Sequence, residues 1–165
     1  MKPVSTTIAG VAIPDSSLAN DATQFVLDTS TQLLYDHSRR VFLWGALIGA
    51  ERGLDFDPEL LYVGAMFHDI GLVEGHRSPD ERFEIDGANA ARRFLERYGL
   101  RDEDVITVWE AIALHTTPEI PRYKQPEVAL VAAGGTMNTD ILEAKVQGYV
   151  RPNFCDYIAN SPFRE

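Results

Sequence analysis

Helical periodicity broken at short intervals is the feature that most constrains the fold of this chain. Apolar residues recur three or four positions apart along most of the 165 residues, whereas the alternation typical of strands is rare. Glycine and proline separate the periodic stretches, so the connections should be short. The pattern predicts helices at about 21–35, 37–53, 58–70, 78–99, 102–115, 127–143 and 152–161. We therefore predict an all-α, single-domain bundle of about six or seven helices.

Several of the predicted helix ends rest on capping residues. Gly53 is suited to end the second helix in the left-handed conformation. Asp57-Pro58 reads as a cap followed by a first-turn proline, and Gly71 stops the helix that begins there. Ser78-Pro79-Asp80-Glu81 has the spacing of a capping box at the start of the fourth helix. Gly134-Gly135 predicts an interruption or a bend in the sixth helix.

Composition supports one domain preceded by a short arm. A hydrophobic content of 45% with 24% charged residues is ordinary for a globular domain of this length. Residues 1–20 are rich in Ser, Thr, Ala and Pro, so we expect an extended N-terminal arm there and the helical domain at 21–165.

Charge and cysteine content limit the partners and the compartment. The net charge of -10 works against nucleic acid and anionic membranes, so we expect a small-molecule partner. Cys155 is the only cysteine, which excludes an intramolecular disulfide and fits a reducing cytoplasm. No stretch predicts a signal peptide or a membrane span. Four apolar residues near the C-terminus could either close the core or support a homo-oligomer: Tyr149, Val150, Phe154 and Tyr157.

The adjacent residues His68-Asp69, at the end of an apolar run, are a candidate metal site. A borderline metal ion accepts imidazole nitrogen and carboxylate oxygen together, and neither group is cheap to bury unpaired. Helical spacing places His37, His68 and His115 on the core faces of three different predicted helices, each near a helix end. One such histidine alone is more often a satisfied core residue. Three together favour a shared site.

The order of these residues resembles that of the HD-domain superfamily of metal-dependent hydrolases. His37 lies in His-Ser-Arg-Arg-Val, His68-Asp69 lies in Ala-Met-Phe-His-Asp-Ile-Gly, and a late aspartate follows. The resemblance covers roughly residues 30–145 and implies a helical bundle of the HD-domain type. It also implies that His37, His68, Asp69 and a distal aspartate bind one metal. Asp140 matches the distal aspartate by position, with Asp156 as the alternative.

A narrower likeness concerns two segments. Residues 82–89 (Arg-Phe-Glu-Ile-Asp-Gly-Ala-Asn) and 113–116 (Ala-Leu-His-Thr) look like the branch that includes cyanamide hydratase, in which a zinc-bound water adds to a nitrile-like carbon. Two-metal HD enzymes need two further histidines on separate helices, and His76 follows the His-Asp pair too closely for this. We expect one divalent ion, zinc before iron, manganese, cobalt or nickel.

These expectations lead to a hydrolytic mechanism and two alternatives for its chemistry. The metal would activate a water or hydroxide, Asp69 would orient it, and His115 would move protons or polarise the substrate. Glu84 could reach the same cleft, or it could simply complement its helix dipole. The few basic residues near the motifs slightly favour hydration of a nitrile or cyanamide over phosphoester hydrolysis. A non-catalytic metal- or ligand-binding sensor module is the third alternative.

Overall fold

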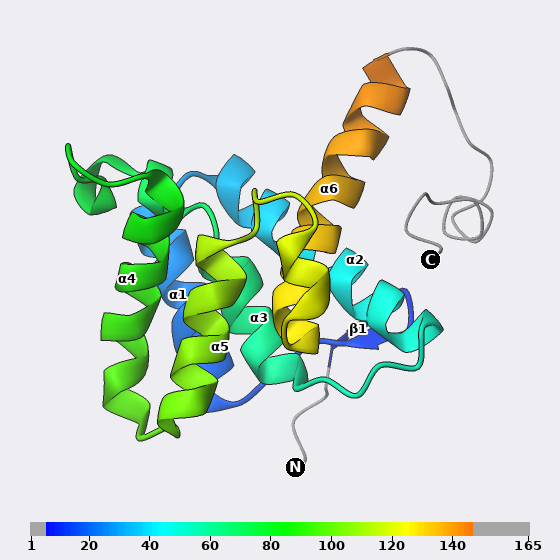
Figure 1. The fold of residues 1–165 in the computed structure, drawn as a ribbon, viewed down its shortest axis with the longest axis horizontal. Helices are drawn as coiled ribbons and strands as arrows, with labels where there is room; N and C mark the ends of the chain where they lie inside the picture. Colours follow the sequence, from blue (N-terminus) through cyan, green and yellow to red (C-terminus); the bar gives the residue numbers. More distant parts are fainter. Residues whose placement is uncertain (1–5, 147–165) are drawn as a thin grey trace.

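The described part of the protein is an all-α bundle, as predicted. The computed structural model describes residues 6–146, and their side chains as far as Met137. Within this part the elements run in the following order (Figure 1): β1 (Thr7–Ile8), β2 (Val11–Ala12), α1 (Ser17–Thr29), α2 (Gln32–Glu51), α3 (Pro58–Phe67), η1 (Ile70–Leu72), η2 (Glu74–His76), α4 (Phe83–Leu95), η3 (Glu96–Tyr98), α5 (Asp102–Ala113), η4 (Ile120–Tyr123) and α6 (Pro126–Val146). The η elements are single 3₁₀ turns, and β1 pairs antiparallel with β2 in a small hairpin.

Helix α3 is the centre of the core. Every residue from Leu60 to Phe67 is buried, as expected for a helix that packs on all sides, and α3 contacts α1, α2, α5 and α6. Asp57 caps its start by accepting hydrogen bonds from the Glu59 and Leu60 amides, with Pro58 in the first turn, as the sequence predicts. The helix ends at Phe67, which leaves His68-Asp69 at the edge of the buried core.

Helices α2 and α6 pack closely because glycines lie between them. A side chain at Gly134 would overlap the carbonyl of Val41, and one at Gly45 would meet the Leu130 carbonyl oxygen at 2.8 Å. Helix α6 continues through both Gly134 and Gly135, so the interruption predicted there is wrong. Gly134 allows a close helix crossing instead of ending the helix.

The first two helices begin earlier than predicted because their caps lie further upstream. Ser16 accepts the Ala19 amide hydrogen bond and Thr31 accepts that of Leu34, so α1 begins at Ser17 and α2 at Gln32. The boundary expected at residue 20 thus falls within α1.

The fourth helix begins later than its capping box predicts. The Ser78 hydroxyl accepts a hydrogen bond from the Glu81 amide, as that motif requires. However, the buried carboxylate of Asp86 accepts the Ser78 amide at 2.7 Å and holds this segment as a loop, so α4 starts at Phe83. Gly99 adopts the left-handed conformation after η3, close to the predicted end.

Two further predictions concern the end of the chain and membranes. The helix expected at 152–161 lies outside the described residues, as do Cys155 and the four apolar residues considered for self-association. Between residues 6 and 146, no helix has the length and apolar character needed to cross a membrane.

Candidate metal centre

The end of α3 fixes the orientation of His68. Its side chain is 2% exposed, and its Nδ1 lies 2.6 Å from the carbonyl oxygen of Ala65. A carbonyl can only accept, so Nδ1 carries the hydrogen and the Nε2 lone pair points away from the helix. A backbone carbonyl on one ring nitrogen is the arrangement that orients histidine as a metal ligand through the other nitrogen.

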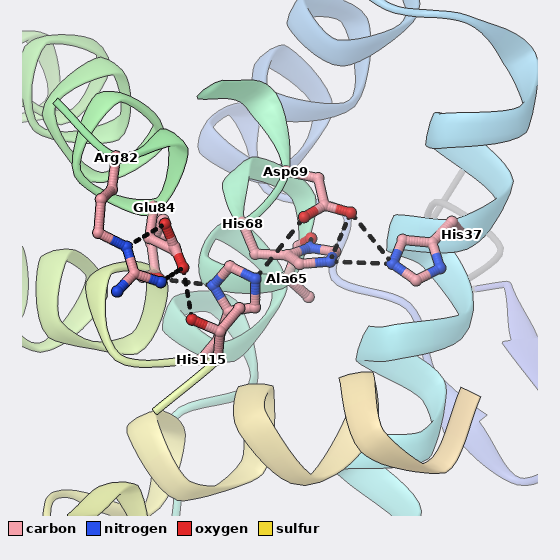
Figure 2. A network of polar contacts seen from close by, with 9 residues as sticks. His37, Ala65, His68, Asp69, Arg82, Glu84 and His115 are labelled. Atoms are coloured by element: carbon pink, nitrogen blue, oxygen red, sulfur yellow. Dashed lines mark hydrogen bonds and ion pairs between the residues drawn. The ribbon is translucent and has the colours of Figure 1, made fainter. Parts of the chain in front are cut away.

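Three ligand atoms meet at this point and form a triangle, which we call the ligand triangle: His37 Nε2, His68 Nε2 and Asp69 Oδ2 (Figure 2). The two nitrogens are 3.0 Å apart, and Asp69 Oδ2 lies 3.3 Å from that of His37 and 3.2 Å from that of His68. Ligand atoms that each bind one ion at about 2.0–2.1 Å are roughly 2.9–3.4 Å from one another in tetrahedral or octahedral geometry. The triangle therefore fits a single metal ion.

His115 stands beside the ligand triangle. Its Nε2 lies 3.6 Å from Oδ1 of Asp69, the carboxylate oxygen that does not belong to the triangle. Its Nδ1 lies 2.6 Å from the carbonyl oxygen of Ile112, so the lone pair of the neutral ring is on Nε2. The sequence predicts His115 at the end of a helix, but α5 ends at Ala113 and His115 occupies the following turn.

Asp69 is ionised in this environment. Burial alone would raise the pKa of its carboxyl group, but the adjacent imidazole rings of His115, His37 and His68 outweigh burial and hold that pKa far below its usual range. A carboxylate that is already ionised at neutral pH needs to lose no proton before it binds a cation.

Glu84 lies near His115, but its carboxylate is hydrogen-bonded to Thr116 and Arg82. Its side chain is 2% exposed, and Oε1 accepts hydrogen bonds from the Thr116 hydroxyl at 2.5 Å and from Arg82 at 2.6 Å. Burial acts to raise the pKa of Glu84, yet these hydrogen bonds lower it, so the group is ionised at neutral pH. Glu84 does not belong to the ligand triangle.

A cavity of about 710 Å³ opens beside the triangle, within the range of about 300–1,000 Å³ that is typical of small-molecule sites. His37, His68, Asp69 and His115 are among the residues that line it. The remaining described lining comes mainly from α6 and the segment after α5, and includes Phe83, Thr116, Pro118, Pro121, Ala129, Ala132 and Ala133.

Two arginines that no sequence motif connects with the site, Arg52 and Arg122, also line this cavity. Arg52 follows α2 directly, between His37 and His68 in the sequence, and Arg122 belongs to η4, seven residues after His115. No sequence pattern indicates these arginines. The wall that α6 contributes to the cavity does have a signal, because the spacing of Ala129, Ala132 and Thr136 places small side chains on one face of the sixth helix.

Asp140 lies on α6, but its side chain is outside the described residues. Position 140 follows Thr136 by four residues and Ala133 by seven, and both of these line the cavity. By helix geometry the three positions share one face. Asp156, the alternative, lies outside the described residues.

Comparison with known proteins agrees with this geometry. The model of the HD domain family matches residues 34–145, more than half of the chain, and this range contains the ligand triangle and His115. The chain belongs to the HD domain family. HD domain proteins are mostly metal-dependent hydrolases that bind divalent metals, and this HD domain brings two histidines and an aspartate together as such a site requires. No curated protein matches the chain.

Proposed function

We propose that this HD domain is an enzyme that uses one divalent metal ion to add water to a small molecule bound in the cavity. The observation that carries the proposal is the ligand triangle, with its three atoms 3.0–3.3 Å apart, in the lining of a cavity of about 710 Å³. His37, His68 and Asp69 would hold the ion, with Asp140 as a fourth ligand.

The donor set suits the metals considered from the sequence. Two imidazole nitrogens and carboxylate oxygens fit zinc first, and also iron, manganese, cobalt or nickel. When bound, such an ion supplies Lewis acidity and a hydroxide nucleophile, since it lowers the pKa of water to about 7 in favourable zinc sites.

Asp69 and His115 would have separate roles in the reaction. Asp69 has Oδ2 in the triangle and Oδ1 outside it, so Oδ1 can accept a hydrogen bond from a water and orient it. His115 lines the cavity and keeps its Nδ1 hydrogen on Ile112, so its Nε2 is the atom that can take up or release a proton.

Two substrate classes remain, and each has an observation in its favour. Arg52 and Arg122 line the cavity, and guanidinium groups are suited to the oxygens of a phosphoester. The likeness of residues 82–89 and 113–116 to the cyanamide hydratase branch favours hydration of a nitrile or cyanamide, which needs no cationic contact. The acidic chain, with its net charge of -10, favours a small molecule over nucleic acid in either case.

A substrate screen with matched variants tests the proposal. The metal-loaded protein would be assayed on phosphomonoesters, nucleotides, cyanamide and aryl nitriles, with His68→Ala and Asp69→Ala as site variants. We expect turnover of one class, lost in both variants while circular dichroism shows an intact fold. Arg122→Gln should raise KM for a phosphoester and leave KM for a nitrile unchanged. Binding without turnover in every class would replace the enzyme with a sensor module.

A further inference from the structure

The first turn of α4 contacts both sides of the site. On one side, a side chain at Gly71, two residues after Asp69, would overlap the carbonyl of Phe83, so the backbones of η1 and α4 touch here. On the other side, the Phe83 ring meets the His115 ring edge-on at 5.7 Å, and Glu84 binds Thr116. This turn therefore lies where it can set the position of His115 relative to Asp69.

His115 is weakly held by its own backbone. It lies beyond the end of α5, and its amide hydrogen bond to the Ile112 carbonyl is long, at 3.4 Å. The next hydrogen bond of the turn runs from the Thr117 amide to the Leu114 carbonyl at 2.9 Å. The ring itself is hydrogen-bonded to the Ile112 carbonyl, and Thr116, the next residue, ties this turn to α4 through Glu84.

The contact between Glu84 and Thr116 is a strong one for its type. Glu84 is ionised, and hydrogen bonds to ionised groups are shorter and roughly twice as strong as neutral ones. Burying a carboxylate costs free energy. An acid that only complements the helix dipole could stay in solvent and avoid this cost, whereas Glu84 is buried. Arg82 also binds Glu84, but its side chain is 78% exposed, so water weakens that ion pair.

We propose that Glu84 is a positioning residue: its buried carboxylate holds the Thr116 hydroxyl and thereby keeps the His115 ring directed at Asp69. This inference rests on the proposed function, in which His115 moves protons at Nε2. It replaces the expectation that Glu84 acts in the cleft itself, because Glu84 is not among the described residues that line the cavity.

The sharpest test changes Thr116. Thr116→Val keeps the shape of the side chain and removes the hydroxyl, whereas Thr116→Ser keeps the hydroxyl. Thr107→Val is the matched control, since the Thr107 hydroxyl binds only the Glu103 carbonyl within α5. The readout is the ¹⁵N spectrum of the His115 ring in metal-free, substrate-free protein, assigned with His115→Gln.

We expect the wild type, Thr116→Ser and Thr107→Val to show one His115 form with the hydrogen on Nδ1. Thr116→Val should show mixed tautomers, because the released ring exchanges its hydrogen bond to Ile112 with water. A wild-type His115 spectrum in Thr116→Val would overturn the proposal, and so would equal disturbance in Thr116→Ser, since the hydroxyl would then not be what holds the ring.

Kinetics of Glu84→Gln supply a second test. Thr116→Val should lower kcat by about tenfold or more. Glutamine at position 84 keeps an acceptor oxygen but loses the charge, so Glu84→Gln should lower kcat by less. The double variant should be no worse than Thr116→Val, and additive losses would contradict the proposal. If Glu84→Gln does not fold, the Thr116 series decides.

The two readouts also separate this proposal from the proposed function. The spectra need neither metal nor substrate, so they test the role of Glu84 even if no substrate is turned over. Turnover together with undisturbed His115 spectra in Thr116→Val would remove the role of Glu84 and leave the enzyme.

Discussion

At the scale of single residues, backbone carbonyls decide what the histidines can do. Ala65 and Ile112 each accept a hydrogen bond from Nδ1 of the histidine three residues later. Both rings are thereby left with Nε2 as the reactive nitrogen, one in the ligand triangle and one facing Asp69. The sequence predicted which histidines converge from their spacing, but not these tautomers, because they depend on where α3 and α5 end.

The buried carboxylate of Glu84 should make stability depend on acid pH. Its pKa is lowered in the folded state, so its contribution is present above the unfolded value of about 4.3 and is lost as pH falls through the folded value. Urea denaturation at pH 7, 4 and 3 should show a smaller loss of stability in Glu84→Gln than in the wild type. The exposed Glu103→Gln variant is the control, and equal acid losses in the wild type and Glu84→Gln would contradict this linkage.

At the scale of elements, periodicity predicted which segments are helical, and caps and tertiary contacts set their ends. Asp57 and Gly99 act near where the sequence places them. Ser78 has the chemistry of a helix start, but its amide donates a hydrogen bond to the Asp86 carboxylate, which holds it in a loop. Gly134 resembles a helix breaker, but its use is the contact with Val41, which appears only when α2 and α6 pack together.

The two adjacent glycines of α6 should therefore respond differently to alanine. A methyl group at Gly134 would overlap the Val41 carbonyl and force the helices apart, so Gly134→Ala should lower the free energy of unfolding by about 1–3 kcal/mol. A methyl group at Gly135 meets nothing within 4 Å, and alanine favours helix by about 1 kcal/mol, so Gly135→Ala should be neutral or stabilising. Urea denaturation of both variants checks this, and equal effects would contradict the packing role of Gly134.

At the scale of the whole molecule, the bundle brings together residues that are far apart in the chain. His37, His68 and His115 come from three segments, and further residues that line the cavity come from a fourth, α6. Amphipathic spacing indicated that these faces turn inward. It could not place Arg52, Arg122 or the contact between Glu84 and Thr116, because these depend on distances between elements that no local pattern encodes.

The small residues of α6 should set how large a substrate the cavity accepts. Ala133 lines the cavity, so Ala133→Leu should raise KM for the larger members of the active substrate class and change KM little for the smallest. Ala50→Leu, at an exposed position at the end of α2, is the control for adding the same side chain. A uniform change across substrate sizes would show that this wall does not contact the substrate.

Metal binding by chelator-free protein tests the central claim most directly. Elemental analysis after equilibrium dialysis against zinc, and separately against manganese, should give one ion per chain in the wild type. His37→Ala, His68→Ala and Asp69→Ala should lose it, whereas His76→Ala should keep it because His76 lies in η2, against Phe25 and outside the ligand triangle. Absence of stoichiometric metal from the wild type, or its retention in His68→Ala, would contradict the proposed site.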